Sequence, residues 1–380
     1  MLKNTAEAQF DYILLAIVAI LTGLGIVILA SASAPFSQEM FGSPSYLLLR
    51  HILWLVLGAI LAFLAFKIRL DFLKKIAPIL VLINLILLAM VFLPVIGVTA
   101  HGASRWINLG IITFQPAEFL KLTFILYLAA WLSNRSEKQM IQKRSGTVGP
   151  KKELKISQTL IAFLVIISVL SLLLALQPDI STLGVIVLTA ILIYFSANTP
   201  FWHLILMFFL ASGSLIALVK IAPYRAERIM VFFQPGIDPL GIGFHARQAL
   251  IAVGSGGIIG TGLGMGIQKF GFLPQPISDS IFAIFAEETG FIGALGLIFL
   301  FLMFFWRGFR IAKNKQSKFF QLTAIGITSW IIIQAFVNIG SMIGLLPVTG
   351  IPLPFIGYGG SHLIAELIGV GILLNISKQT

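Results

Sequence analysis

The sequence contains no cysteine among its 380 residues. Disulfide bonds and thiol chemistry are therefore excluded, and cysteine usage says nothing about the redox compartment. Charged residues are also scarce, because they make up only 11% of the chain and only 14 of them are acidic. This supply is too small to cover a water-soluble globular protein of this length.

The chain is instead rich in long apolar runs. Hydrophobic residues make up 58% of the chain and the mean hydropathy is +1.01. Many runs approach the roughly 20 residues that span a hydrocarbon core. They are continuous rather than alternating, which excludes a transmembrane barrel. The sequence therefore predicts an all-α polytopic membrane protein with a single membrane domain over residues 1–380.

Ten spanning helices are predicted from these runs. The first, Tyr12 to Ala32, is interpreted as a retained helix because it is long and lacks a small-residue cleavage pattern. Residues 222–279 are predicted to form a large extracellular loop between the seventh and eighth helices, and a polar loop of this length usually carries function. The predicted helices cover residues 12–33, 46–66, 74–97, 115–133, 158–176, 180–197, 201–221, 280–306, 319–345 and 361–377.

Most of the 26 lysines and arginines lie in alternate connections. By the positive-inside rule these connections face the cytoplasm, so both termini and a basic loop at 134–157 are expected there. This distribution explains the net charge of +12 without a nucleic-acid partner, and we expect none. The connections are the N-terminus, residues 67–75, 134–157 and 307–318, and the C-terminal tail.

The other basic residues lie on the predicted outer side or within a helix, where topology does not account for them. We interpret them as contacts for an anionic ligand at the outer membrane surface, such as a lipid phosphate or diphosphate. Pairing with Glu227, Asp238 and lipid head groups is the alternative. The residues are Arg50, Arg105, Lys121, Lys220, Arg225, Arg228, Arg247 and Lys269.

Ionisable side chains beside predicted spans are costly and often functional. Glu118 and Lys121 are three residues apart on one helix and can pair, either as a structural ion pair or as the lining of a substrate cavity. Asp179 follows Gln177-Pro178 and suits the N-cap of the next helix, a position from which it can also organise a site.

Asp279 lies at the outer end of the eighth predicted helix, after a loop that carries Arg and Lys. Helix capping is one interpretation. A single carboxylate near cations is also the minimum requirement for general-base chemistry. Glu287 and Glu288 lie two turns further in, and at least one should face a protein interior or a watery cavity. Those two residues and Glu366 are interpreted as structural.

Two glycine-rich segments predict shaped backbone rather than nucleotide binding. No strand precedes GSGGIIGTGLGMG (254–266), so close backbone packing of a re-entrant loop is expected there. PVTGIPLPFIGYGGS (347–361) predicts a bent loop on the outer side. The histidines at 101, 203, 245 and 362 are dispersed without paired metal spacing, and no metal site is predicted.

Together these segments resemble the SEDS family, whose members include FtsW and RodA, and they do so in order along nearly the whole chain. RWINLG, GLGMGIQKFGFLP and IPLPFIGYGG resemble the FtsW type more than the RodA type. The matching segments are residues 11–34, RWINLG (105–110), FQPAEFLKL (114–122), LQPDIST (176–182), PYRAERI (223–229), the Gln248-to-Gly257 run, LPQPISDSIFAIFAEETGFIG (273–293) and residues 347–361.

The resemblance implies a ten-helix peptidoglycan glycosyltransferase of the bacterial cytoplasmic membrane. Such enzymes polymerise lipid II at the outer face and release undecaprenyl diphosphate. FtsW-type members act in the division septum with a class B penicillin-binding protein and other divisome proteins. The sequence does not decide whether a divalent cation is required.

The resemblance also assigns site residues. The family's catalytic aspartate corresponds to Asp279, its Glu/Lys pair to Glu118 and Lys121, and its QPD aspartate to Asp179. We expect the remaining substrate contacts from the outer arginines and from residues beside the motifs, namely Arg105, Trp106, Arg225, Arg228 and Ser278.

The chain departs from the family pattern just before Asp279. Gln275 and Ile277 replace the usual acidic residue and histidine of LPEAHTDFIFA. Three alternatives to a septal polymerase remain open: a flippase for a lipid-linked precursor, which Glu118, Lys121 and Glu366 would suit; a RodA-type elongation polymerase; and a non-catalytic scaffold. The absence of a convincing internal repeat weighs against many transporter folds.

Overall fold

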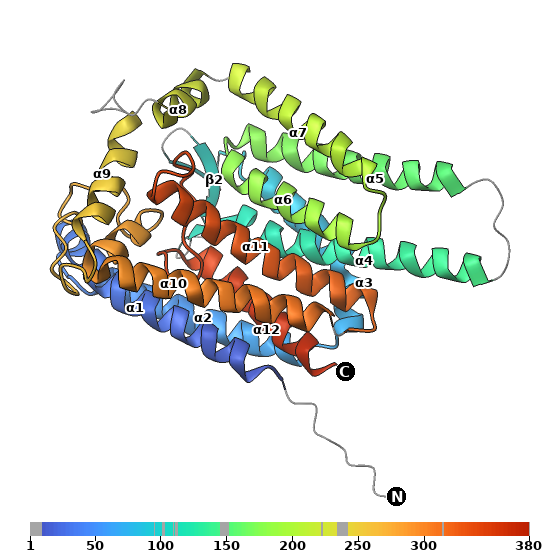
Figure 1. Cartoon of the computed structure of the whole chain (residues 1–380), viewed down its shortest axis with the longest axis horizontal. Coiled ribbons are helices and arrows are strands. Elements are labelled where there is room, and N and C mark those ends of the chain that lie inside the picture. The colour runs from blue at the N-terminus through green and yellow to red at the C-terminus, as the bar shows by residue number, and fades with distance from the viewer. Residues whose placement is uncertain are drawn as a thin grey trace, which may run out of the picture.

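The computed structural model describes residues 10–94, 96–100, 103–108, 110, 113–144, 152–221, 223–233, 242–313 and 315–379. Within these ranges the chain forms a bundle of helices with one small sheet (Figure 1). The helices are α1 (Tyr12–Phe41), α2 (Tyr46–Lys67), α3 (Leu70–Met90), α4 (Pro116–Arg144), α5 (Lys152–Leu176), α6 (Ile180–Ser196), α7 (Trp202–Ile221), α8 (Pro223–Phe233), α9 (Ile242–Ser255), α10 (Ile281–Lys313), α11 (Lys318–Met342) and α12 (Gly360–Lys378).

The predicted fold class is confirmed. Eight helices of the described part are long and apolar enough to cross a membrane. Two shorter apolar helices, Ile180–Ser196 and Trp202–Ser214, coincide with the sixth and seventh predicted spans. The count of ten spans stays a prediction, because these two helices are shorter than the other eight.

A short antiparallel sheet was not expected from the sequence. Its strands are β1 (Gly97–Ala100), β2 (Ala103–Asn108) and β3 (Thr113–Phe114), in the order β1-β2-β3. The predicted extension of the third helix to residue 97 is therefore wrong, since α3 ends at Met90. Pro94 has no backbone N–H with which to continue a helix, and the β-branched Val98 and Thr99 then pair with Trp106 and Ser104 of β2.

The basic segment 134–157 is also more helical than a loop. α4 continues to Arg144 and α5 starts at Lys152, so only the middle of the segment lies outside the helices. Glu, Lys, Gln and Arg are good helix formers, and an apolar span can therefore continue as a polar helix into water. Figure 1 shows α4 and α5 extending together beyond the rest of the bundle.

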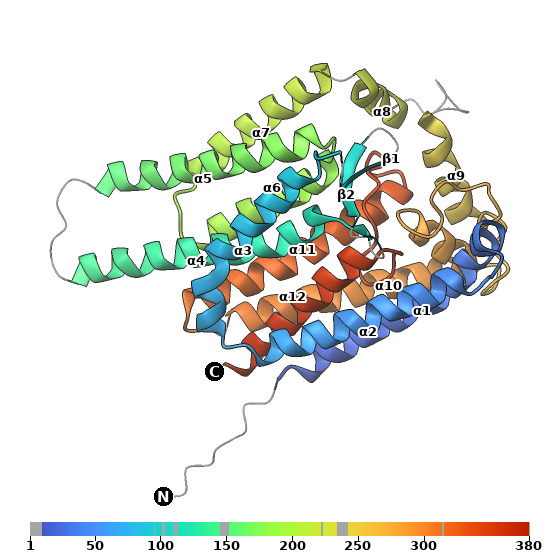
Figure 2. The same ribbon diagram turned by 180° about the vertical axis from the view of Figure 1, so that it is seen from behind.

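Helices α2 and α12 pack at unusually short range. A Cβ at Gly371 of α12 would clash with the Ala62 carbonyl oxygen of α2, and a Cβ at Gly58 would lie 2.6 Å from Leu367 Cδ1. Lipid tails are as apolar as the helices, so such close approach and interhelical hydrogen bonds hold membrane helices together. Asn375 Nδ2 adds two of these bonds, to Ala65 O at 3.1 Å and Ile68 O at 2.6 Å. Figure 2 shows the two helices side by side.

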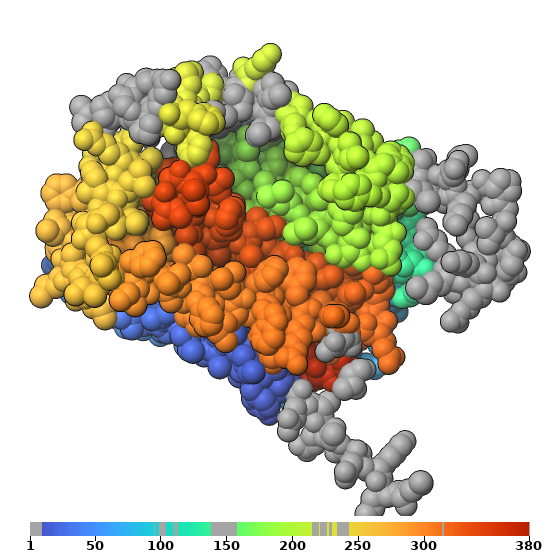
Figure 3. Space-filling model, viewed as in Figure 1, coloured from blue at the N-terminus to red at the C-terminus, as the bar shows by residue number. Residues whose placement is uncertain are grey.

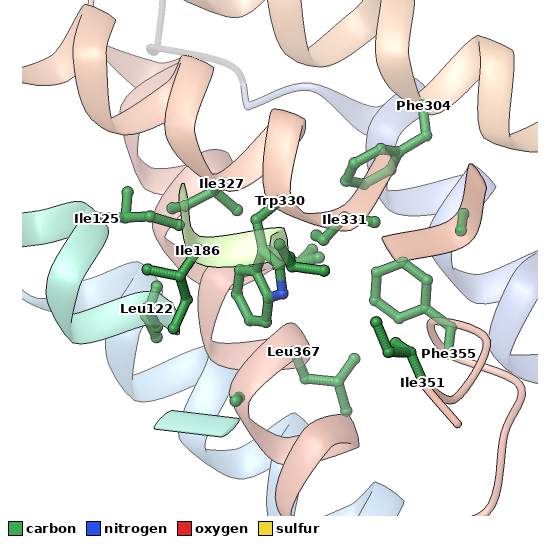
Figure 4. Packing of buried hydrophobic residues seen from close by; sticks show 14 of the residues in the cluster. Leu122, Ile125, Ile186, Phe304, Ile327, Trp330, Ile331, Ile351, Phe355 and Leu367 are labelled. Atoms are coloured by element: carbon green, nitrogen blue, oxygen red, sulfur yellow. The ribbon is translucent and has the colours of Figure 1, made fainter. Parts of the chain in front are cut away.

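The apolar core centres on α11. Trp330 is fully buried, and Leu122 of α4, Ile186 of α6 and Ile327 surround its indole (Figure 4). On the other side of α11, Phe304 of α10 and Phe355 pack together with ring centroids 6.0 Å apart. This core fixes α11 between α4, α6, α10 and α12, and α11 then carries the polar groups described below.

Both described ends of the chain meet in one cluster. The Asp11 carboxylate accepts from the N–H of Leu14 at 2.9 Å and caps α1. It also pairs with Arg307 of α10 at 2.7 Å. The N–H of Asp11 donates to Ser377 Oγ at 3.0 Å. The first described helix and the last helix therefore begin and end at the same end of the bundle, as an even number of spans requires.

Candidate functional site

A buried ion pair lies near the start of α4. Lys121 Nζ is 2.7 Å from Glu118 Oε2, and both side chains are at most 5% exposed. Lys121 also donates to Gln334 Oε1 at 2.9 Å and lies 5.4 Å from the ring centroid of Trp330. The structure thus confirms that Glu118 and Lys121 pair, and it adds a partner on α11 that the sequence analysis did not identify.

Gln334 extends this pair toward α12 and the 343–359 segment, which connects α11 to α12. Its Nε2 donates to Glu366 Oε1 at 3.1 Å and to Pro352 O at 3.1 Å. Glu366 in turn accepts from the N–H of Phe355 at 2.8 Å. This supports the structural interpretation of Glu366, because the carboxylate holds the backbone of the 343–359 segment in place.

Asn338 lies one turn further along α11 and reaches Asp279. Its Nδ2 donates to Asp279 O at 2.7 Å and to Ile351 O at 2.7 Å. Adjacent carbonyls of the 343–359 segment, at Ile351 and Pro352, are therefore bound by two amides of one helix face. We call this set the polar network: Glu118, Lys121, Gln334, Asn338 and Glu366.

The Asp279 carboxyl group lies just before α10, which begins at Ile281. The residue is only 8% exposed. Ser278 Oγ donates to Asp279 Oδ1 at 2.8 Å, and a Cβ at Gly350 would lie 3.7 Å from Oδ2. The backbone of Gly350 therefore passes close to the carboxylate. The structure brings Asp279 and Ser278 together beside the polar network.

Asp179 caps α6, as the sequence predicts. It accepts from the N–H of Thr182 at 3.4 Å and is 4% exposed. Burial raises the pKa of the Asp179 carboxyl group, while the nearby Arg105 guanidinium opposes this shift. Arg105 projects from β2 and donates to Gln177 O at 3.2 Å and to Pro178 O. Arg105 and Asp179 are thus neighbours, although they are far apart in the sequence.

Trp106 follows Arg105 on β2 and is half-buried. Successive side chains of a strand point to opposite faces, so Trp106 does not share the direction of Arg105. Arg225 and Arg228 lie in α8, and their side chains are outside the described part of the chain. Their assignment to the site stays a prediction.

Lys269 does not face an anionic ligand, which corrects one expectation. Its Nζ pairs with Glu288 Oε1 at 2.8 Å and donates to Ser31 Oγ at 2.7 Å and Gly264 O at 2.7 Å. Both side chains of the pair are at most 3% exposed. A lysine surrounded by these acceptors has no donor left for a substrate phosphate, so its role is to fix the loop.

The glycine-rich segment packs closely against α10, as expected. A Cβ at Gly260, where φ is +83°, would clash with Glu288 O, and a Cβ at Gly256 would clash with Ala286 O. α10 is itself interrupted at Gly290, with φ 68° and ψ −168°. Glu287 accepts from the N–H of Ile267 at 2.8 Å. The prediction that at least one of Glu287 and Glu288 faces the interior is confirmed, and in fact both are buried, at 2% and 1% exposure.

The two positions at which the chain departs from the family pattern have structural roles. Ile277 is 8% exposed, and its carbonyl accepts from the N–H of Tyr358 at 2.8 Å. Gln275 adopts a positive φ of 48°, and its carbonyl accepts from the N–H groups of Ser278 and Ser280, both at 3.3 Å. These contacts hold the turn that positions Asp279 without an acidic side chain or a histidine.

Gln334 and Asn338 were missed in the sequence analysis, although a signal existed. They are polar amides four residues apart in a mostly apolar predicted span, so they lie on one face of the helix. Intramembrane polar side chains usually face the bundle interior. Among the residues that the structure describes, no group of three or more His, Cys, Asp or Glu side chains could hold a metal ion.

Comparisons with known proteins give one consistent result. A family model described as "Cell cycle protein", which covers FtsW, RodA and SpoVE, matches residues 12–380. The stage V sporulation protein E of Bacillus subtilis (strain 168) is 38% identical over 377 residues, which are 99% of each chain. A probable peptidoglycan glycosyltransferase FtsW of Coxiella burnetii is 35% identical over 381 residues, which cover 100% of this chain and 99% of the relative.

Solved structures agree with the sequence relatives. A chain of a peptidoglycan synthase complex superimposes with a TM-score of 0.75 at 29% identity and 97% coverage of both chains. The rod shape determining protein RodA of Thermus thermophilus gives a TM-score of 0.68 at 28% identity, with 97% of this chain and 96% of that chain covered. The similarity therefore extends over nearly the whole chain.

Proposed function

Because the chain belongs to the FtsW/RodA/SpoVE family of cell cycle proteins, we propose that it is a peptidoglycan glycosyltransferase that polymerises lipid II into glycan strands. It is a multi-pass membrane protein. The relatives named FtsW favour a septal role in cell division over a role in elongation. Basic connections at one end of the bundle support cytoplasmic termini in the bacterial cytoplasmic membrane and a site that faces outside.

The observation that carries the proposal is the position of Asp279. Its carboxyl group is largely shielded from water, flanked by the Ser278 hydroxyl at 2.8 Å, and its backbone is fixed by Asn338. A positioned carboxylate of this kind suits a general base, and general-base catalysis contributes about 10²–10⁴-fold in rate.

The reaction is a single displacement. The 4-hydroxyl of the acceptor sugar attacks the anomeric carbon of the donor, and Asp279 takes the hydroxyl proton. The bond between the anomeric carbon and the diphosphate oxygen breaks, and undecaprenyl diphosphate leaves with the electron pair of that bond. The configuration at the anomeric carbon is inverted. Cationic side chains stabilise the charge that develops on the leaving group, and Arg105, Arg225 and Arg228 are the candidates for this role.

We propose that the remaining site residues shape the site around the substrate. Glu118, Lys121 and Asp179 lie beside the 343–359 segment, and Trp106 offers an aromatic surface to a sugar. The surface in Figure 3 is hollowed between α7 (yellow-green) and the C-terminal elements (orange and red). We propose that this hollow holds the prenyl chains. A class B penicillin-binding protein supplies cross-linking, in line with the synthase complex that the chain resembles.

The test is polymerisation of lipid II by the purified chain, alone and with its penicillin-binding protein. Wild type is expected to form glycan strands, and Asp279→Asn is expected to lose about 10²-fold or more of the rate. Glu39→Gln, which removes an exposed carboxylate on α1, is the matched control and should keep full activity. Glycan formation by Asp279→Asn at the wild-type rate would show that Asp279 is not the base.

The same preparation separates the polymerase from a flippase. In reconstituted vesicles, glycan product supports the enzyme. Movement of fluorescent precursor across the bilayer without any product, in wild type and Asp279→Asn alike, would identify a transporter instead.

A further inference from the structure

A cavity of about 430 Å³ lies between α3 and α4, and none of its lining residues belongs to the polar network. Ligand pockets commonly fall between about 300 and 1,000 Å³. The proposed reaction makes no use of this cavity. Its lining consists of Asp71, Lys74, Lys75, Pro78, Tyr127, Ala130, Trp131 and Asn134.

The cavity lies at the end of the bundle that carries the C-terminus. α2 ends at Lys67 and α3 begins at Leu70. Lys378 lies 3.3 Å from the ring centroid of Phe66, and Asn375 donates to Ile68 O at 2.6 Å. The first turn of α3, with Asp71 and Lys74, therefore lies beside the end of the last helix, at the level where a spanning helix leaves the hydrocarbon.

Two lysines give the cavity a positive rim. Lys74 pairs with Glu137 at 3.1 Å, but the two side chains remain 22% and 55% exposed. Lys75 is exposed and makes no ion pair within the part of the chain that the structure describes. Asp71 is the one carboxylate of the lining. Since Glu137 occupies Lys74, Lys75 is the cation that remains for an anionic ligand, and Asn134 adds an amide donor.

The opposite wall is aromatic. Tyr127 and Trp131 lie one turn apart on α4, and the Arg135 guanidinium lies 5.6 Å from the Trp131 ring centroid. Trp, Tyr and Lys together are typical of side chains at the head-group level of a bilayer. Pro78 has no N–H to donate to the Lys74 carbonyl. That carbonyl is left as an acceptor for a hydroxyl group.

Lys75 of the cavity lining also belongs to an exposed, mostly apolar stripe of α3. Phe72, Ile79 and Leu82 are 54%, 57% and 57% exposed. With Lys75 they recur at intervals of three, four and three residues, so all four share one face of the helix. A head group bound at Lys75 would have its acyl chains running along Ile79 and Leu82.

From this geometry we propose that the cavity binds the phosphodiester head group of an anionic phospholipid. Lys75 and Asn134 contact the phosphate, the Lys74 carbonyl accepts from a head-group hydroxyl, and Tyr127 and Trp131 cover the glycerol. The acyl chains lie on the exposed stripe of α3. A free phosphate ion offers the same anionic chemistry but would not use the stripe.

Native mass spectrometry of the purified full-length chain in detergent tests the proposal. Phosphatidylglycerol and phosphatidylcholine with identical acyl chains are titrated in turn. Wild type is expected to bind phosphatidylglycerol at least about fivefold more tightly, since one lysine near an anionic lipid contributes about this factor. Lys75→Gln should lower phosphatidylglycerol binding about fivefold and leave phosphatidylcholine binding unchanged.

Lys313→Gln is the matched control. It removes an exposed lysine at the end of α10, close to Lys315, which donates to the Ser377 carbonyl. If Lys313→Gln and Lys75→Gln lower phosphatidylglycerol binding equally, the preference for this lipid comes from general charge attraction. That result would overturn the proposed site. Asn134→Ala and Trp131→Leu give independent variants, and an unchanged thermal unfolding midpoint shows that each one folds.

Two further arms identify the ligand class. Inorganic phosphate at millimolar concentration should not displace phosphatidylglycerol, and complete displacement would identify a free-anion site. Undecaprenyl diphosphate should not compete better than phosphatidylglycerol. If undecaprenyl diphosphate competes better than phosphatidylglycerol, and Lys75→Gln removes this advantage, the cavity binds the prenyl carrier. That result would overturn the phospholipid assignment.

Discussion

Asn338 holds Asp279 by its backbone rather than by its carboxylate. The amide Nδ2 lies 2.7 Å from Asp279 O and 2.7 Å from Ile351 O. The Asp279 carboxylate itself accepts from Ser278 Oγ at 2.8 Å, and the Gly350 backbone lies beside it. Two chain segments that meet at the proposed base are joined by one side chain of α11.

We expect Asn338→Leu to lower kcat for lipid II polymerisation about 10²-fold with little change in KM. The substitution leaves two buried carbonyls without their donor and lets Asp279 shift, and a misplacement of about 1 Å can have such an effect. Steady-state kinetics with purified lipid II measures it. Ser341→Ala, which removes a hydroxyl that donates to the Asn338 carbonyl at 2.8 Å, should keep most activity. A change in KM alone would contradict the positioning role.

Lys269→Met should destabilise the protein by about 3–5 kcal/mol. It leaves the Glu288 carboxylate buried without a counter-ion, the situation in which breaking a buried pair is most costly. The double variant Lys269→Met/Glu288→Leu should recover part of this loss. Thermal unfolding in detergent, together with limited proteolysis of residues 257–272, measures both. A double variant no more stable than the single one would show that the pair is not the cause.

Arg225→Ala should raise the lipid II concentration needed for half-maximal rate, because the arginine is proposed to bind the diphosphate. About tenfold is expected for the loss of one charge-assisted contact. Arg310→Ala removes an exposed arginine in the last turn of α10, at the opposite end of the bundle from the proposed site, and is the matched control. An unchanged lipid II titration would remove Arg225 from the site.

Arg105→Gln should make stability more sensitive to pH. Burial raises the folded-state pKa of Asp179 above 3.8, and Arg105 opposes this rise. The folded state therefore holds its proton more tightly than the unfolded state, and stability falls as pH rises from about 4 toward the folded pKa. Without Arg105 that pKa rises further, so the loss continues to higher pH.

Unfolding midpoints in detergent from pH 4 to pH 8 measure this effect. The steeper loss in Arg105→Gln should disappear in Arg105→Gln/Asp179→Asn, where the titrating group is absent. The same steep loss in that double variant would assign the pH dependence to another group.

The sequence predicted best those features that depend on the local geometry of a single helix. Tyr12 to Ala32 could be assigned to a span from hydropathy, Glu118 and Lys121 to one face from their spacing, and Asp179 to a cap from the preceding proline. Each of these depends on local geometry, and each was confirmed.

Contacts between distant segments were harder to predict from the sequence. The pairing of Lys269 with Glu288 depends on a loop folding back onto α10, and the chain order alone does not give that approach. Val98 and Thr99 continue an apolar run, so hydropathy extended a helix across them, although strand pairing with β2 overrides it. The spacing of Gln334 and Asn338 indicates a shared, inward-facing helix face. Their hydrogen-bond partners could not be predicted, because these depend on which backbone carbonyls lie opposite α11.

The spacing of Gln334 and Asn338 along α11 fixes the distance between two parts of the site. The two amides are separated by one helical turn, a rise of about 6 Å, and this covalent interval sets how far the Glu118–Lys121 pair lies from Asp279. Substrate pressing on the 343–359 segment cannot change that interval without unwinding the helix. One residue inserted between them would turn Asn338 by about 100° about the axis and take its amide away from Asp279, even with every side chain of the site still present.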